Sequence, residues 1–187
     1  MGIRHEAREW ALQFLFQSEF NQAESLDEGF KLFWQHQEEE DPAPPPEEGK
    51  KAATKPELTL RETRMRDKAR MFAEELVRGV IAHHLEIDPL IAQHAENWEL
   101  DRMGAVDRNS MRIAVFEMLY RNDIPPVVSI NEAVDLAKVY SSIQSGKFVN
   151  GILDRIRKGI DRPARNPNAP TPAPVPPKSP EKTNPKG

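Results

Sequence analysis

Apolar residues recur at helical spacing in nearly every segment of this chain, and this periodicity restricts the fold class more than any other feature. In the first segment, the residues that share one side at a 3.6-residue period are Ile3, Ala7, Trp10, Ala11, Phe14 and Ser18. No segment alternates apolar and polar residues as a strand would, and no two-residue hairpin signal is present. The sequence therefore predicts an all-α fold of about seven helices, whose short connections favour antiparallel packing of neighbours.

Proline and capping residues indicate where the middle helices begin. A second helix is expected over residues 26–37, with aromatic residues facing inward, and a long third helix over 60–84. Asp88 followed by Pro89 is a favourable N-cap and N1 pair, so a fourth helix is expected to start there. Asp107 can cap the next helix in the same way.

The last two helices carry their own boundary signals. Ser129 and Glu132 form an S-x-x-E capping box, which predicts a helix start at this point. A final helix is expected to open near Ser145. Gly159 would end it, because glycine tolerates the left-handed conformation that follows many helices.

The 17 prolines divide the chain into a folded part and two other segments. They cluster in residues 41–56 and 163–185. We expect one helical domain over residues 1–162, with an acidic Pro-rich insert at 38–58. Residues 163–187 would then form a disordered Pro-rich tail. The remaining length, roughly 140 residues, is typical of a single domain with a real core.

Composition excludes several classes of protein and site. The chain has no cysteine, so disulfides and thiolate metal sites are excluded. No apolar run approaches the ~20 residues of a membrane span, and the charged N-terminus has no signal-peptide core, which predicts a cytoplasmic protein without membrane contact. His83 and His84 would point about 100° apart on a helix, and no Gly-rich phosphate loop or nucleophile elbow is present. We therefore expect no metal, no cofactor and no enzymatic activity.

The net charge of −4 hides an uneven distribution. Segment 38–58 contains seven acidic residues and three lysines. Its charge of −4 therefore equals the net charge of the whole chain. Residues 61–70 contain five cations beside two acids. Global acidity thus leaves room for a local basic face. Because the cluster at 61–70 faces several directions around one helix, a solvated surface is the preferred interpretation, with RNA contact as the alternative.

The first helix carries more apolar surface than one core face needs. Leu12 and Phe16 lie about 140° and 180° from Ala7 at 100° per residue. They would form either an exposed patch for a protein partner or a face covered by a second helix. Arg4 and Arg8 on this helix could contact phosphates, although an ordinary solvated face would also explain them.

The last helix has an aromatic residue beside its inward stripe. Phe148 lies about 100° from the centre of that stripe, and Lys147 lies on the far side. An exposed ring next to a cation suits RNA, since the ring can stack on an unpaired base while the cation meets phosphate. The alternative is that Phe148 packs under the preceding loop.

Three stretches of sequence together resemble one known family. They are "AREWALQFLF" at residues 7–16, "DRNSMRIAVFEML" at 107–119 and "VSINEAVDLAKVYSSIQSGKFVNGILDRI" at 128–156. The last contains the pattern "INEAV-LAK", a short loop and "KFVNG-LD". These motifs are similar to those of the NusB transcription antitermination factor family. The resemblance covers most of the chain from Arg4 to about Ile160.

The resemblance implies a fold and a function. NusB proteins are all-helical, with two small antiparallel bundles set side by side. They bind the boxA element of ribosomal RNA transcripts together with the ribosomal small-subunit protein NusE. The resulting RNA polymerase antitermination complex reads through terminators. Two rivals are a helical scaffold without RNA binding and an accessory domain like those of rRNA cytosine methyltransferases. The latter enzymes have a Gly-rich cofactor loop that this chain lacks.

The resemblance also implies roles for single residues. The positions that match the family's RNA-binding residues are Arg4, Arg8, Arg112, Lys147 and Phe148. Those that match or adjoin its NusE-binding positions are Leu12, Phe16 and Asp107. We further expect Lys147 and Phe148 to lie beside Arg4 and Arg8 on one continuous surface. The chain departs from the family at Phe16, where tyrosine is common, and at Gln144 and Gly146.

Overall fold

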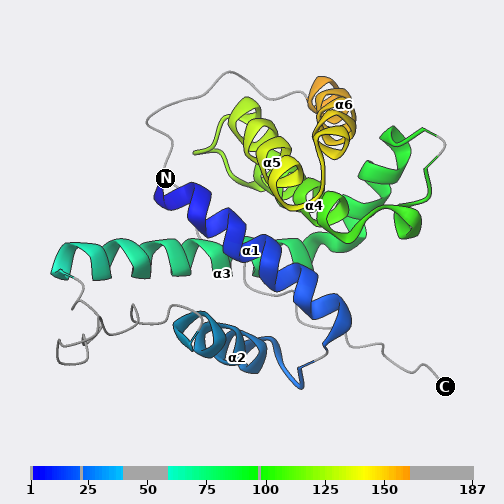
Figure 1. The fold of residues 1–187 in the computed structure, drawn as a ribbon. Coiled ribbons are helices and arrows are strands. Elements are labelled where there is room, and N and C mark those ends of the chain that lie inside the picture. Colours follow the sequence, from blue (N-terminus) through cyan, green and yellow to red (C-terminus); the bar gives the residue numbers. More distant parts are fainter. Residues whose placement is uncertain (1, 22, 40–58, 97, 161–187) are drawn as a thin grey trace, which may run out of the picture.

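Six α-helices and one 3-10 helix make up the part of the chain that the structure, a computed structural model, describes (Figure 1). The described residues are 2–21, 23–39, 59–96 and 98–160. The helices are α1 (Ile3–Phe20), α2 (Leu26–Glu39), α3 (Leu60–His94), η1 (Leu100–Arg102), α4 (Ala105–Tyr120), α5 (Pro126–Tyr140) and α6 (Ile143–Gly159). No strand occurs within these ranges, which confirms the all-α prediction. The predicted tail and most of the predicted insert lie outside the described residues.

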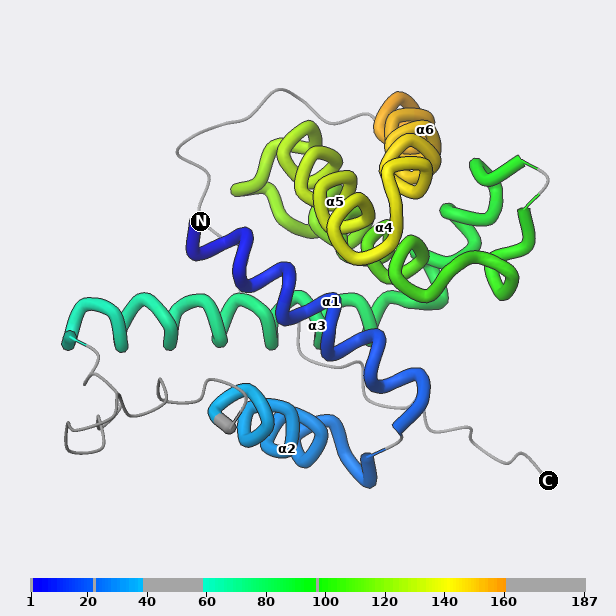
Figure 2. Tube along the Cα trace, in the orientation of Figure 1, coloured from blue at the N-terminus to red at the C-terminus, as the bar shows by residue number. Residues whose placement is uncertain are grey.

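The helices form two small bundles that share one core (Figures 1 and 2). Helices α1, α2 and α3 make one bundle, while α4, α5 and α6 make the other. Helix α1 lies between them, because it packs against α3 and α4 and also contacts α2 and α5. None of the described helices is both long and apolar enough to cross a membrane.

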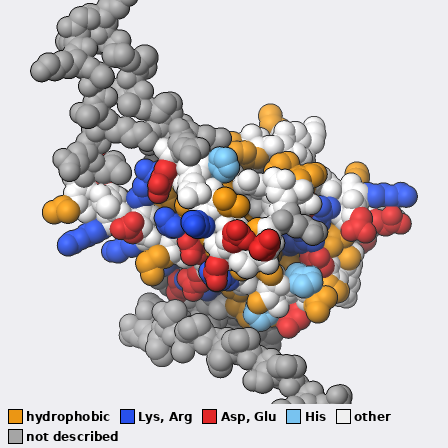
Figure 3. Space-filling model, turned by 90° about the horizontal axis from the view of Figure 1, so that it is seen from below, with side chains coloured by type: hydrophobic (Ala, Val, Ile, Leu, Met, Phe, Trp, Pro, Cys, Tyr) orange, Lys and Arg blue, Asp and Glu red, His pale blue; other side chains and the backbone are white. Residues whose placement is uncertain are grey.

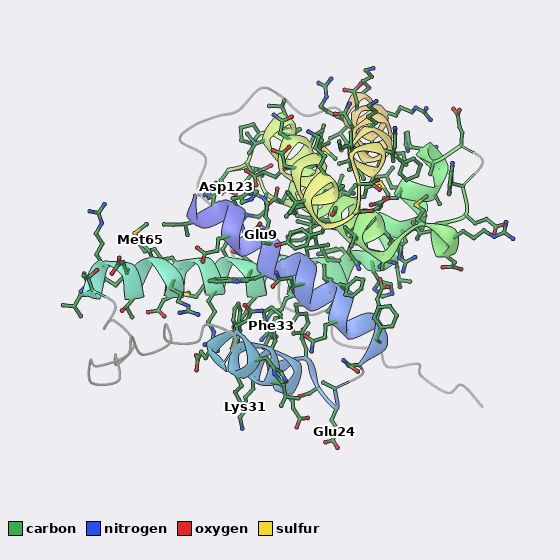
Figure 4. All side chains as sticks on the ribbon, in the orientation of Figure 1. Glu9, Glu24, Lys31, Phe33, Met65 and Asp123 are labelled. Carbon is green, nitrogen blue, oxygen red and sulfur yellow. The ribbon has the colours of Figure 1, made fainter. Side chains whose placement is uncertain are left out.

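Aromatic side chains attach α2 to the rest of its bundle. The rings of Phe14 and Phe30 are stacked with centroids 4.4 Å apart, and Trp10 meets Trp34 edge-on at 5.3 Å. Phe33, labelled in Figure 4, packs edge-on against Phe14 at 5.5 Å. The predicted inward positions of this helix are therefore confirmed. The helix continues through residue 39, two residues beyond the predicted end.

One prediction about α3 is wrong, because this helix continues through Pro89 instead of restarting there. Proline lacks the N–H that would bond to the carbonyl of Leu85. Leu85 is 78% exposed, so water can satisfy that carbonyl. The buried Ile87 and Ile91 carry the apolar row past the proline. Asp88 accepts hydrogen bonds from a side chain of α4 instead of capping a new helix.

The predicted capping box at Ser129 is also wrong. Helix α5 begins three residues earlier at Pro126, a residue suited to the first helical position. Ser129 is consequently buried inside the helix, where its hydroxyl has no partner among the described residues. The carboxylate of Glu132 instead lies 2.8 Å from Nδ1 of His5, which ties α5 to α1.

Genuine caps occur elsewhere. Thr59 and Glu62 form a reciprocal capping box at the start of α3. Ser142 caps α6 by accepting a hydrogen bond from the backbone N–H of Ser145 at 3.0 Å, so this helix begins two residues before the predicted start. Gly159 is its last residue and not the residue that follows it.

A glycine allows α3 and α4 to approach closely. A Cβ atom at Gly79 would lie 2.0 Å from Cζ of Phe116. No side chain other than hydrogen therefore fits at this crossing. The contact fixes the distance between the two bundles and so positions the surfaces described next.

Candidate functional site

Arg8 is held in a buried ion pair between the two bundles. Its Nε donates to Oε1 of Glu117 at 2.8 Å, and its Nη2 donates to Oε2 at 3.2 Å. Arg8 and Glu117 are 2% and 0% exposed. The third nitrogen, Nη1, donates to the backbone carbonyl of Arg4 at 3.0 Å. The prediction that Arg8 contacts phosphate is therefore wrong: its charge is paired and inaccessible, and it ties α1 to α4.

Arg4, by contrast, remains accessible at the start of α1. Its side chain is 55% exposed and forms an ion pair with Asp123 at 3.0 Å. Its guanidinium also lies 5.5 Å from the ring centroid of Phe72, which Arg121 approaches to 5.0 Å. Burial favours the neutral form of Asp123, but the hydrogen bond from Arg121 and the charges of both arginines outweigh it and lower the pKa of this carboxyl. Arg4 remains a candidate phosphate contact.

The first turns of α6 present a second candidate surface. Gly146 is buried against α5, where a Cβ atom would lie 2.6 Å from Cγ of Lys138. A larger residue at this position would require Lys138 to move. The next residue, Lys147, is exposed.

Phe148 is half-buried and packs edge-on against Trp98. The two ring centroids are 5.4 Å apart with an interplanar angle of 60°. Trp98 precedes η1, so Phe148 lies against this segment and not simply under the loop before α6. Trp98 is 53% exposed and was not predicted as a functional residue. The sequence offered one indication of this role, because Trp98 is a large aromatic residue that belongs to none of the apolar stripes of the predicted helices.

The two candidate RNA-binding groups adjoin different parts of α5. Asp123, the partner of Arg4, precedes the start of α5 at Pro126. Gly146 packs instead against Val134 and Lys138, further along the same helix. From Pro126 to Val134 the helix rises by roughly 12 Å. An RNA that touched both groups would have to follow α5 for at least this distance.

The two apolar residues predicted for a protein partner separate into core and surface. Leu12 is 2% exposed and belongs to the core, so its assignment to an exposed patch is wrong. The reason is that α1 has helices on more than one side. Phe16 is 41% exposed and Phe20 is 69% exposed, with ring centroids 5.2 Å apart. We call Phe16 and Phe20 the aromatic pair.

Arg112 lies in an ion-pair network that limits its contact with RNA. It donates to both carboxylate oxygens of Asp88 at 2.7 Å and lies 3.4 Å from Oε1 of Glu19. Its side chain is only 18% exposed. Two carboxylates thus already neutralise the charge that was predicted to bind RNA.

Glu19 also connects the aromatic pair with the start of α4. It accepts a hydrogen bond from Nη2 of Arg108 at 2.7 Å and one from Nδ2 of Asn109 at 2.9 Å. Asp107, the residue before Arg108, lies in the first turn of α4. Gly104 and not Asp107 occupies the N-cap position, which corrects the predicted capping role. The structure therefore brings Asp107 and the end of α1 to the same region.

Comparison with known proteins agrees with this architecture. A sequence profile of the NusB family matches residues 5–158. This chain belongs to the NusB family. The transcription antitermination protein NusB of Myxococcus xanthus is 42% identical over 164 residues, which are 87% of this chain and 100% of that protein. The protein of the same name from Desulforapulum autotrophicum is 40% identical over 164 residues, covering 87% of this chain and 97% of that protein.

Solved NusB structures share the fold. T. maritima NusB is 35% identical with a TM-score of 0.61, and the match covers 83% of this chain and 90% of that one. A crystal structure of antitermination factors NusB and NusE in complex with dsRNA contains a chain that is 28% identical. Its TM-score is 0.61, with coverage of 84% of this chain and 98% of that one.

Proposed function

We propose that this chain is a transcription antitermination factor that binds boxA-type RNA of ribosomal RNA transcripts together with the ribosomal protein NusE. Its family relatives carry the name of transcription antitermination proteins. A similar chain has been crystallised with NusE and RNA. The complex would act on RNA polymerase as part of an antitermination assembly.

The group at the start of α6 carries the RNA-binding part of the proposal. The rings of Trp98 and Phe148 pack edge-on, and the exposed Lys147 lies next to Phe148 in sequence. Aromatic faces stack on unpaired bases, and a cation neutralises phosphate.

The aromatic pair carries the protein-binding part. Exposed aromatic rings are enriched at the centres of protein interfaces. Phe16 and Phe20 lie at the end of α1, close to the charged network around Glu19. An apolar centre flanked by charged groups is the usual arrangement of such an interface.

A binding titration tests the proposal directly. We expect labelled boxA RNA to bind the purified chain more tightly in the presence of NusE than in its absence, because both proteins would contact the same RNA. A scrambled RNA of equal length is the control and should bind more weakly. Absence of boxA binding both with and without NusE would contradict the proposal.

Substitution of the α6 residues tests the location of the RNA site. Phe148→Ala should weaken RNA binding by about 1–3 kcal/mol through lost stacking. Lys147→Ala should reduce the salt dependence of binding. The slope of the logarithm of the binding constant against the logarithm of the salt concentration should be smaller by about 0.7 for a single strand. Leu85→Ala, which removes an exposed apolar side chain elsewhere, serves as the control and should leave RNA affinity unchanged. If Phe148→Ala and Lys147→Ala both bind like the unaltered chain, RNA binds at another surface.

A further inference from the structure

The first turns of α3 project beyond the rest of their bundle. In Figure 1 the start of this helix extends past the start of α1. Met65, labelled in Figure 4, lies on this projecting part. Every residue from Thr59 to Met65 is exposed, and the first buried residue of the helix is Ala69. The first turns of α3 therefore pack against no other described helix and extend into solvent.

Three cations of this projecting part have no partner among the described residues. They are Arg61, Arg64 and Lys68, and we call them the basic row. Two neighbouring cations differ: Arg70 pairs with Glu74 at 3.3 Å and stacks on a tryptophan of α2, and Arg66 has interactions of its own. Figure 3 shows Lys and Arg side chains gathered at the left edge, where α3 begins.

The two acids that lie among the row in the described part of α3, Glu62 and Asp67, form no ion pair with it. The carboxylate of Glu62 caps the helix, accepting hydrogen bonds from the backbone N–H of Thr59 at 2.9 Å and from its hydroxyl at 2.7 Å. These hydrogen bonds lower the pKa of Glu62, so the carboxylate stays ionised and engaged with the cap. Asp67 lies about 60° around the helix from Arg64 and forms no ion pair with another described residue.

The basic row shares one face of α3 with Phe72. At 100° per residue, positions 61, 64 and 68 fall within about 60° of one another, and position 72 continues the same stripe. The guanidinium of Arg4 lies 5.5 Å from the Phe72 ring centroid. The row therefore runs along α3 toward Arg4, the predicted RNA-binding residue of α1 that remains exposed.

We infer that the basic row is an additional RNA-binding surface, which contacts the phosphates of RNA that flanks the boxA element. This inference rests on the proposed function. The row is about 10 Å long, which spans roughly three phosphates of one strand. An acidic protein segment could also attract these cations, but the continuity with Arg4 favours RNA. Phosphate contacts add affinity without reading sequence, so this surface would strengthen binding of longer transcripts.

A triple substitution with a matched control tests the inference. The variant Arg61→Gln, Arg64→Gln, Lys68→Gln removes the row at exposed positions. The control Lys31→Gln, Arg102→Gln, Lys158→Gln makes the same change in net charge at exposed positions elsewhere. Both are titrated, with NusE present, against boxA RNA that carries its natural flanking nucleotides, at several salt concentrations.

The triple variant should lose salt dependence, and the control should not. Each phosphate contact contributes about 0.7 to the slope of the logarithm of the binding constant against the logarithm of the salt concentration, for a single strand. The loss of three contacts should therefore reduce this slope by about 2. Between 50 and 200 mM salt, the unaltered chain should then lose about 20-fold more affinity than the triple variant. Circular dichroism of both variants checks that helicity is retained.

Three results would overturn the inference. The first is equal affinity and equal slope for the triple variant and the unaltered chain. The second is an equal loss in the control, which would reveal a general effect of net charge. The third is weaker binding of NusE measured without RNA, which would make the row a protein contact. Failure of the unaltered chain to bind boxA RNA would instead refute the proposed function itself.

Discussion

Glu117→Ala is expected to lower the free energy of unfolding by about 3–5 kcal/mol. Removal of this carboxylate leaves the guanidinium of Arg8 buried without its ionic partner, and an unpaired buried charge is strongly destabilising. The pair lies between α1 and α4, at 2% and 0% exposure, so solvent cannot replace the lost partner. Urea denaturation followed by circular dichroism measures the change.

Two further variants show whether burial is responsible. The double variant Arg8→Met, Glu117→Leu removes both charges and should be close to neutral, because apolar residues of similar volume can replace a buried pair. Asp154→Ala breaks an exposed pair with Arg157 and Lys158 and should lower the free energy of unfolding far less than Glu117→Ala does. A cost below about 1 kcal/mol for Glu117→Ala would contradict the account, as would equal losses in the single and double variants.

The burial of Arg8 explains why this part of the site could not be predicted from the sequence. Arg8 is separated from Glu117 by 109 positions, and nothing in the local pattern of either residue indicates the pairing. A helical wheel also assumes one buried face. Helix α1 contacts four other helices, so Leu12 is buried although it lies far from Ala7 on the wheel. Phe16 lies on the opposite side of the helix from Ala7 and is exposed, as the interpretation of an exposed patch for a protein partner requires.

The positions of the helices could be predicted from the sequence more reliably than the residues at which they begin and end. Apolar periodicity predicted the helices correctly, because it reports burial along a whole element. Helix ends depend on single residues, whose side chains have alternatives. Asp88 binds Arg112 instead of capping a helix, and Glu132 binds His5 instead of closing a capping box. In both cases a tertiary partner replaced the local hydrogen bond that the motif predicts.

Phe16→Asp is expected to weaken NusE binding by about 2 kcal/mol or more, which is roughly a 30-fold increase in Kd. The ring is 41% exposed and lies against Phe20, so it offers apolar area that a partner can cover. An aspartate there would have to be desolvated on binding without a compensating charge. Isothermal titration calorimetry with purified NusE measures the change.

Because Phe16 already faces solvent, the substitution should leave the fold intact. Circular dichroism should show unchanged helicity and a thermal midpoint close to that of the unaltered chain. Val139→Asp is the matched control, since Val139 is a 67% exposed apolar residue on α5 and the same charge is introduced. It should leave NusE affinity unchanged. Unfolding of Phe16→Asp would make Phe16 a core residue, and equal weakening in both variants would show that added negative charge, not the loss of this ring, reduces binding.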